Sequence, residues 1–367
     1  MGYSRGIGIV GLGVISRAYL ETLVGHADVR IVAVADLDAE RARAVAETVP
    51  GARALSVSEL LADPEVDTVL NLTIPAAHAE IAHGAISHGK NVYGEKPLTA
   101  VLDDARAVMA SAAAAWVHVG CAPDTVLGTG VQTARAAIDA GHIGRPIAAT
   151  AAFFSAGHES WHPNPHFYYL PGGGPLFDMG PYYLSALVHM LGPIVTVQGA
   201  GSRTRSVRTI GSGPREGETL DVEVATHVTG VLTHASGALS TVTFSFDAHA
   251  SEAKPIEVHG EAGSLSVPDP NYFDGDVRIS RGDGWELVPV SAGYEHGSRG
   301  VGLLDFAVGD APARRASGEL ALHTLEVMTL LLESAETGER RRVSTAPERP
   351  EPVPLTTEAE WRRIADA

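Results

Sequence analysis

Near its start the chain reads Ile7-Gly8-Ile9-Val10-Gly11-Leu12-Gly13-Val14-Ile15-Ser16, and this stretch decides the fold. An apolar strand pattern runs into a glycine turn, and a helical pattern follows. Gly11 permits the tight turn, and Gly13 lets the backbone approach a pyrophosphate that the helix N-terminus then stabilises. Ser16 replaces the usual third glycine and is still small enough for close helix–strand packing. We therefore expect a dinucleotide to contact Gly11, Gly13, Val14 and Ile15.

The second predicted strand ends at Asp36, about 20 residues after the glycines. A carboxylate at this point accepts hydrogen bonds from both hydroxyls of a ribose and repels a 2′-phosphate. Arg41 and Arg43 lie nearby, but both fall inside the following helical pattern. The sequence therefore predicts NAD as the cofactor, with NADP as the less favoured alternative.

The first 120 residues alternate short apolar runs with patterns of helical length. The strand-like runs are 7–10, 31–35, 68–72, 91–93 and 116–120. The helical patterns are 39–48, 78–88 and 102–115. Regular alternation implies right-handed crossovers and a parallel sheet covered on both faces. We therefore predict an α/β, doubly wound Rossmann domain over residues 1–122.

After residue 122 the pattern changes. From residue 147 onward, period-2 stretches joined by hairpin turns dominate; they are 149–155, 222–233, 238–246, 256–267 and 277–290. This pattern predicts an α+β domain over residues 123–344 with a large, mainly antiparallel sheet. A proline-rich tail, 345–367, is expected either to wrap around the protein or to end flexibly.

Composition excludes several function classes. The chain has 367 residues, and 27 basic against 44 acidic side chains give a net charge of −17. Such an acidic protein repels a phosphate backbone, so we expect no nucleic-acid partner. The single Cys121 rules out an internal disulfide and fits a reducing cytoplasm. No signal peptide or membrane span is expected, because no basic region precedes a long apolar stretch.

Two further segments make the pattern specific: Thr73-Ile74-Pro75-Ala76-Ala77-His78, and then Glu95-Lys96-Pro97 after another strand. Together with the glycine turn they resemble the Gfo/Idh/MocA oxidoreductases, which include glucose-fructose oxidoreductase and inositol 2-dehydrogenase. The resemblance implies a dehydrogenase that acts on a secondary hydroxyl of a sugar, glycoside or cyclitol, or on the corresponding ketone. It also implies cofactor contacts at Thr73, Pro75, His78, Glu95 and Lys96.

Lys96 supports this interpretation independently of the resemblance. It follows a parallel strand at the carboxyl end, where open α/β sheets bind ligands. Beside an oxidised nicotinamide its ammonium meets a like charge, so it gives up a proton more readily and can help to deprotonate a substrate hydroxyl. The family has a cis peptide before the proline, which leads us to expect one between Lys96 and Pro97.

A second motif begins at Gly172-Gly173-Gly174 and continues into a helix predicted over 176–191. Asp178, Tyr182, Ser185 and His189 share one face of this helix. Asp178 is expected to bind a sugar hydroxyl and to stabilise charge on Lys96. Tyr182 occupies the family's acid/base position, where inositol dehydrogenases have His, so the base stays open between Tyr182 and Lys96. His189 is expected to be a core residue.

The segment His158-Glu159-Ser160-Trp161-His162 matches the H-E-x-x-H pattern of zinc proteases. Pro163 and Pro165 follow at once and disfavour the helix that this motif requires. We therefore predict no metal site and expect a sugar-binding rim, in which Trp161 stacks on a pyranose and His158 and His162 bond its hydroxyls. Asp124 is a further candidate for substrate binding.

Two alternatives stay open beside the dehydrogenase. One is a glycosidase of the same family that oxidises the sugar ring transiently with NAD. The other is a non-catalytic NAD-binding regulator, which would have no need of Lys96 and Asp178. The family's C-terminal sheet often packs against another subunit, so a homodimer or homotetramer is expected.

Overall fold

The computed structural model describes residues 4–162, 164–308 and 315–364. The chain forms two compact units: the first comprises 1–132, 291–322 and 350–367, and the second comprises 133–290 and 323–349. The sequence led us to expect domains that are continuous in the chain, with boundaries at 122 and 344. In the structure, residues 291–322 and most of the tail belong to the first unit instead.

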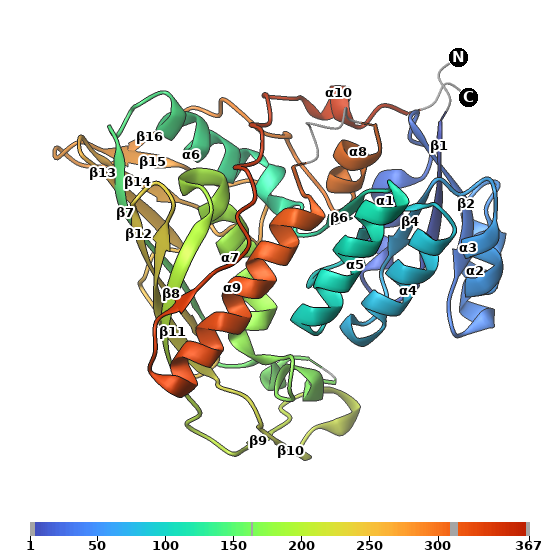
Figure 1. Ribbon diagram of the computed structural model, residues 1–367, viewed down its shortest axis with the longest axis horizontal. Coiled ribbons are helices and arrows are strands. Elements are labelled where there is room, and N and C mark those ends of the chain that lie inside the picture. The colour runs from blue at the N-terminus through green and yellow to red at the C-terminus, as the bar shows by residue number, and fades with distance from the viewer. Residues whose placement is uncertain (1–3, 163, 309–314, 365–367) are drawn as a thin grey trace. The chain divides into compact units, whose positions relative to one another are not determined.

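The first unit is built on a six-stranded parallel sheet in the order β3-β2-β1-β4-β5-β6, of which Figure 1 labels β1, β2, β4 and β6. Its strands are β1 (Arg5–Val10), β2 (Val29–Ala35), β3 (Arg53–Ala54), β4 (Thr68–Asn71), β5 (Asn91–Gly94) and β6 (Val119–Cys121). Its alternating helices are α1 (Ser16–Leu23), α2 (Ala39–Thr48), α3 (Val57–Ala62), α4 (Pro75–Ser87) and α5 (Leu102–Ala115). The predicted doubly wound Rossmann arrangement is confirmed.

This topology determines where a ligand can bind. Strand order reverses between β1 and β4, so the chain leaves these neighbouring strands in opposite directions. Open α/β sheets bind ligands in the crevice that such a reversal leaves at the carboxyl ends of the strands. Val10 and Asn71, the last residues of β1 and β4, pair with each other at that edge.

Two local features of the first unit differ from the sequence prediction. The last strand was expected to begin at Trp116, but Trp116 ends α5 in the left-handed conformation, with φ of 56° and an exposed ring. The short β3 and α3 were not predicted. Helix α3 begins at a capping box, in which the Ser56 hydroxyl and the Glu59 carboxylate bond each other's backbone N–H groups.

The returning segments complete the first unit. They contribute α8 (Val301–Val308) and α10 (Glu358–Trp361), and a short 3-10 helix, η1 (Thr125–Leu127), follows β6. Phe306 of α8 packs on the Tyr93 ring of β5, with 5.7 Å between ring centroids. Isolated bridges join Ala292 to Pro354 and His26 to Ile364. Of the two expectations for the tail, these bridges match the wrapping one.

The second unit contains a nine-stranded sheet in the order β16-β15-β14-β13-β7-β12-β11-β8-β17. Its strands are β7 (Pro146–Phe154), β8 (Ile194–Ser202), β11 (His227–His234), β12 (Leu239–Ser245), β13 (Ile256–Gly260), β14 (Ser264–Val267), β15 (Arg278–Ser280), β16 (Glu286–Leu287) and β17 (Arg341–Arg342). Its adjacent strands pair antiparallel except β7 and β12, which are parallel. The predicted, mainly antiparallel sheet is confirmed.

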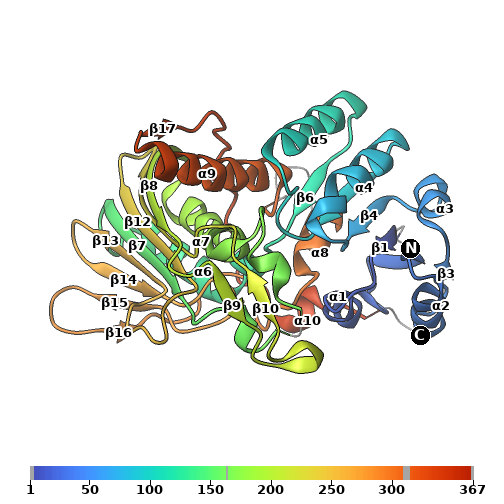
Figure 2. The ribbon, with the colours of Figure 1, turned by 90° about the horizontal axis from the view of Figure 1, so that it is seen from below.

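Helix α7 (Gly174–Leu191) lies on one face of this sheet, with α9 (Gly318–Thr337) beside it (Figures 1 and 2). The two helices approach closely, because a Cβ on Gly180 would lie 2.7 Å from the Met328 sulfur. The chain passes between the units four times: within α6 (Thr129–Asp139), after Val290, within α9 and after Arg349. A small ribbon, β9 (Val207–Thr209) and β10 (Thr219–Asp221), and three 3-10 helices, η2 (His158–Ser160), η3 (His166–Tyr168) and η4 (Gly213–Arg215), complete the second unit.

Within the described part of the chain, none of the helices combines the length and the apolar character that a membrane crossing requires.

Candidate functional site

The turn after β1 has the conformation that a phosphate-binding loop needs. Gly11 has φ of +93°, and a Cβ there would lie 2.7 Å from the backbone of Leu72 and Thr73, so only glycine fits. A Cβ on Gly13 would meet no atom within 4 Å, which leaves room for a ligand against its backbone. Helix α1 has neither a side-chain cap nor an acidic residue in its first turn. The Ser16 and Ala18 N–H groups bond the carbonyl oxygens of Gly13 and Ile15, so it is the positive end of the helix dipole that can stabilise an anion at this turn.

Asp36 lies directly after β2 and is connected to the glycine turn. Its Oδ2 accepts a hydrogen bond of 2.7 Å from the Leu12 N–H, and its Oδ1 accepts one of 2.9 Å from the Asp38 N–H. Arg41, on the first turns of α2, places Nη1 3.2 Å from Oδ1. Burial alone would raise the Asp36 pKa, but these two N–H groups and the guanidinium together hold the pKa below its ordinary value. The carboxylate is therefore ionised and able to accept ribose hydroxyls.

Three large apolar side chains are exposed around this edge of the sheet. Val14 is 98% exposed, Leu37 is 100% exposed and Ile74 is 70% exposed. They lie in the loops after β1, β2 and β4, which are neighbours in the sheet. Apolar side chains left in water on three adjacent ligand-binding loops are typical of a site that a bound molecule covers.

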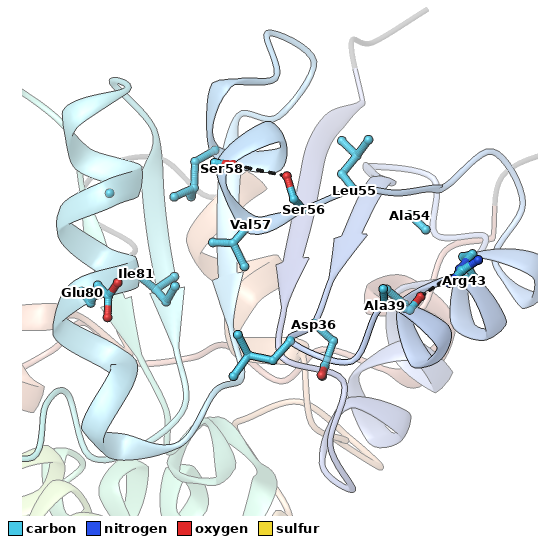
Figure 3. Close-up of a pocket in the computed structure, with 14 residues that line it drawn as sticks. Asp36, Ala39, Arg43, Ala54, Leu55, Ser56, Val57, Ser58, Glu80 and Ile81 are labelled. Atoms are coloured by element: carbon cyan, nitrogen blue, oxygen red, sulfur yellow. Dashed lines mark hydrogen bonds between the residues drawn. The ribbon is translucent and has the colours of Figure 1, made fainter.

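A pocket of about 770 Å³ opens beside Asp36 (Figure 3). Its lining comes from α2, the β3–α3 segment and α4, and includes Ser56, Glu80 and Ile81. Figure 3 shows the Asp36 carboxylate at one end of the pocket and Ile81 at its α4 side. The lining is mostly apolar, with few polar groups, as small-molecule sites generally are.

The Glu95-Lys96-Pro97 segment follows β5 at the same edge. The peptide bond between Lys96 and Pro97 is cis, as expected. The Tyr19 hydroxyl of α1 donates a 2.8 Å hydrogen bond to Oε1 of Glu95, and Oε2 of Glu95 accepts one of 3.1 Å from the Lys96 N–H. One carboxylate thus links the phosphate-binding helix to the backbone of Lys96. Tyr19 was not predicted as a site residue, because its place in α1 looks like ordinary core.

The structure gives the predicted residue His78 a bonding role inside the first unit, with the predicted Thr73 as one of its partners. His78 is buried, and its ring nitrogens lie 2.7 Å from the Pro97 carbonyl oxygen and 3.0 Å from that of Thr73. Its ring therefore joins the two loops expected to contact the cofactor, and Pro75 begins α4 between them.

Asp124, a candidate for substrate binding, is fully buried. Its Oδ2 accepts hydrogen bonds from the N–H groups of Gly300 and Gly302, at 2.8 and 3.2 Å, and its Oδ1 lies 3.3 Å from the Arg299 guanidinium. Burial raises the Asp124 pKa, while Arg299 and the two N–H groups oppose this shift. These contacts hold residues 299–302 against the start of η1. Asp124 therefore has a structural role here, and its side chain is not accessible to a substrate.

In the second unit, Asp178 and Tyr182 lie one turn apart on α7, as predicted. Asp178 is partly buried, and its Oδ2 lies 2.7 Å from Nε2 of His158. Tyr182 and most of the following residues of α7 are buried. His189 is also buried, as expected for a core residue, and its carbonyl oxygen accepts a 2.6 Å hydrogen bond from Arg349.

The His158–His162 segment forms the short 3-10 helix η2 and a turn, so it is not the regular helix of a zinc protease. Glu159 points inward, where Arg208 donates a 2.6 Å hydrogen bond to its Oε1 and the Tyr169 hydroxyl bonds its Oε2. Among the described residues, no group of three or more His, Cys, Asp or Glu side chains has the arrangement of a metal site.

The predicted sugar-binding rim divides into an inner and an outer part. His158 is buried among the rings of Tyr168 and Phe246, with centroid distances of 4.3 and 4.5 Å. Trp161, by contrast, is 58% exposed, and its ring lies 5.4 Å from that of His162. Burial lowers the His162 pKa. Trp161 and His162 thus remain accessible, whereas His158 faces Asp178.

Comparison with known proteins gives matches along most of the chain. A model described as "Oxidoreductase family, NAD-binding Rossmann fold" matches residues 5–122, and one described as "GFO/IDH/MocA C-terminal domain" matches residues 131–266. The 1,5-anhydro-D-fructose reductase of Ensifer adhaerens is 28% identical over 348 residues, which cover 92% of this chain and 98% of that protein. The inositol 2-dehydrogenase of Rhizobium meliloti is 25% identical over 285 residues, covering 77% and 81%.

Among solved structures, levoglucosan dehydrogenase in complex with NADH and L-sorbose superposes with a TM-score of 0.77 at 20% identity. The match covers 93% of this chain and 99% of that one. At this identity the likeness establishes a shared fold.

Proposed function

The chain belongs to the Gfo/Idh/MocA family of oxidoreductases, and on this premise we propose that it is an NAD-dependent enzyme acting on a secondary hydroxyl of a sugar, glycoside or cyclitol, or on the corresponding ketone. The observation that carries the proposal is the carboxyl edge of the parallel sheet. There, the open backbone at Gly13, the ionised Asp36 and the exposed Val14, Leu37 and Ile74 surround one helix N-terminus.

The residues of this edge fit a dinucleotide. The backbone of the glycine turn and the positive end of the α1 dipole would face the pyrophosphate, and the Asp36 carboxylate would accept the ribose hydroxyls. The exposed apolar side chains would cover the flat faces of the bases. We propose NAD over NADP because the Asp36 carboxylate is ionised; the nearby Arg41 reduces its repulsion of a 2′-phosphate without removing its hydrogen-bonding capacity.

When bound, the nicotinamide supplies the hydride chemistry. The proposal assigns the proton chemistry to the chain's own residues. Lys96 hydrogen-bonds the reacting hydroxyl and helps to move its proton, with Tyr182 as the second proton-transfer group. Asp178 accepts a hydrogen bond from the substrate and fixes its orientation. The names of the relatives, a reductase of an anhydro sugar and a dehydrogenase of inositol, support substrates rich in hydroxyl groups.

The exposed aromatic side chains beside η2 and η3 fit the same substrate class. Trp161 and Phe167 are both more than half exposed, and His162 lies between their rings at 5.4 and 5.5 Å. A pyranose or cyclitol ring offers a face of C–H groups that packs on an indole. We propose that Trp161 provides this surface and that His162 bonds a hydroxyl beside it.

The experiment that tests the function is a panel of cyclitols, anhydro sugars, aldoses and glycosides, assayed with NAD and with NADP. Formation of reduced cofactor is followed by absorbance, and release of an aglycone is followed in parallel. NAD-linked turnover of at least one member is the expected result. Aglycone release without net NADH would favour the glycosidase, and NAD binding without any turnover would favour the regulator.

We also propose that the protein is a homo-oligomer through the face of the nine-stranded sheet opposite α7. Register places Val231 and Leu239 on that face, each more than two fifths exposed, together with Thr229, Thr241 and Thr243. These apolar and hydroxyl side chains form a patch that suits a second copy of the same sheet, with the charged Glu257 and Arg340 at its margins. Size-exclusion chromatography with light scattering gives the mass of the protein in solution, and Val231→Arg or Leu239→Arg is expected to yield the monomer.

A further inference from the structure

His158 was expected to bond a substrate hydroxyl. In the structure, one of its two ring nitrogens has a hydrogen-bond partner, and that partner is Asp178. Nε2 lies 2.7 Å from Asp178 Oδ2, a distance typical of a charge-assisted hydrogen bond. The other nitrogen, Nδ1, is buried and has no hydrogen-bond partner. Placing the ring proton on Nε2 satisfies the contact with the carboxylate and leaves only a lone pair without a partner at Nδ1.

The imidazole is fixed by rings on three sides. Tyr168 and Trp161 approach it edge-on, at centroid distances of 4.3 and 5.1 Å, and Phe246 lies 4.5 Å away. Such packing leaves the imidazole one orientation, in which Nε2 faces α7. The partner of Nε2 is therefore determined by the packing of the loop and does not depend on a bound substrate.

The backbone that carries His158 is fixed by a buried charge cluster. Arg208 is almost completely buried and bonds both Glu159 and Asp247, as well as the carbonyl oxygens of Ala156 and Phe246. Tyr169 joins this cluster, because its hydroxyl donates to Glu159 and accepts a 3.1 Å hydrogen bond from the His158 N–H. A buried, multiply bonded arginine of this kind holds its partners in one arrangement.

Gly157 makes this arrangement possible. Its φ is +104°, and a Cβ there would lie within 2.6 Å of side-chain atoms of Glu159, Arg208 and Tyr169. The chain therefore enters the loop through a conformation that only glycine adopts without strain, and the next residue is His158.

We propose that His158 is a positioning residue, which fixes the orientation of the Asp178 carboxylate for the substrate. This inference rests on the proposed function, because it assumes that Asp178 contacts the substrate. It also explains why a histidine next to a predicted substrate-binding residue is enclosed by aromatic rings and kept from solvent.

The test compares His158→Phe, which keeps an aromatic ring and removes the donor, with His158→Gln, whose amide N–H can replace Nε2. We expect His158→Phe to lower kcat/KM for the sugar about 10- to 100-fold, the cost of losing a hydrogen bond to a charged group. NAD affinity should not change. We expect His158→Gln to restore kcat/KM to within about fivefold of the wild type.

His166→Phe serves as the matched control, since His166 lies on the same loop but contacts Arg215. It should change kcat/KM by no more than about twofold. Equal losses in His158→Phe and His166→Phe would overturn the proposal, as would an unchanged kcat/KM in His158→Phe. A failure of His158→Gln to recover any activity would also count against it.

A second measurement separates this proposal from the proposed function. In protein with ¹⁵N-labelled histidine, the Nε2–H of His158 should give a downfield NMR signal that Asp178→Ala removes and His166→Phe leaves in place. Absence of turnover by the wild type across the panel would overturn the proposed function, while this signal would still report the pairing. Persistence of the signal in Asp178→Ala would overturn the pairing itself.

Discussion

The Tyr19 hydroxyl donates a 2.8 Å hydrogen bond to Glu95, the residue that precedes Lys96. Tyr19 is fully buried, and burial together with the Glu95 carboxylate raises its pKa well above the ordinary value. The hydroxyl therefore stays protonated and donates throughout the working pH range. We expect Tyr19→Phe to lower the free energy of unfolding by about 1–3 kcal/mol, because it leaves a carboxylate without its donor.

Urea unfolding measures this loss, with the exposed Tyr272→Phe as the control. Because Glu95 also bonds the Lys96 N–H, Tyr19→Phe should in addition weaken NAD binding or turnover. Equal stability of the two variants would show that the bond contributes nothing.

Lys96→Ala should reduce NAD-linked turnover by at least about 100-fold, the scale for losing a proton-transfer group. The KD for NAD should change far less, since the phosphate-binding turn and Asp36 are untouched. Stopped-flow absorbance and calorimetry measure the two quantities. Lys254→Ala is the matched control, because Lys254 is exposed in a loop of the second unit. Turnover close to that of the wild type in Lys96→Ala would assign the proton transfer to Tyr182 or another group.

Asp36→Ser should shift cofactor preference toward NADP by about 10- to 100-fold, expressed as the ratio of kcat/KM values for the two cofactors. The variant loses the acceptor for the ribose hydroxyls, and it frees the half-exposed Arg41 guanidinium for a 2′-phosphate. Asp38→Ser is the control, because Asp38 caps α2 and serine is also a good cap. An unchanged ratio in Asp36→Ser would remove the basis for the predicted NAD preference.

The stability of the second unit should fall as the pH drops from about 6.5 to about 4, owing to His323. Burial lowers the pKa of His323 from 6.5 to about 4. Its Nε2 accepts a hydrogen bond from the Ile194 N–H, and its Nδ1 pairs with Thr345 Oγ1, which in turn donates to Glu326. A proton on Nε2 would break the first of these bonds.

Between the two pKa values the unfolded chain binds a proton that the folded chain does not, so stability is lost as the pH falls through this window. The loss amounts to about 3 kcal/mol over the full shift. Urea unfolding at several pH values gives the free energy of unfolding as a function of pH. Between about pH 4 and 6.5 this free energy should depend more steeply on pH in the wild type than in His323→Gln. Identical slopes would show that His323 is not responsible.

The sequence predicted well those helices whose apolar residues repeat with a strong helical period. Helices 39–48 and 102–115 have the predicted bounds, because their helical periodicity is strong. Helix α8 was not predicted, and wrapping of the tail was only one of two expectations with no site of contact named, since the partners of both segments are distant in the sequence. The contacts of Asp124 could not be predicted for the same reason. Its partners Arg299, Gly300 and Gly302 lie about 175 residues further along the chain.

The candidate site was predictable in part. The glycine turn and Asp36 have a spacing that predicts their proposed roles, and Lys96 has a position at the end of a strand that does so, whereas the proposed role of Tyr182 came from the resemblance to the family. The orientation of the His158 side chain could not be predicted from the sequence. It depends on Arg208, 50 residues away, which bonds the neighbouring Glu159, and on the positive φ of Gly157. The presence of Glu159 beside two histidines suggested a metal motif, whereas the carboxylate serves a buried arginine.

Because the first unit is not continuous in the sequence, it cannot be completed early in the synthesis of the chain. Residues 291–322 and 350–364 complete this unit, yet a ribosome synthesises them after nearly all of the other unit has emerged. The Rossmann strands must therefore wait for their last partners while some 160 intervening residues are made, instead of folding as a finished domain during translation. A fragment that stops at residue 132 would lack Arg299, leaving the Asp124 carboxylate without its cation.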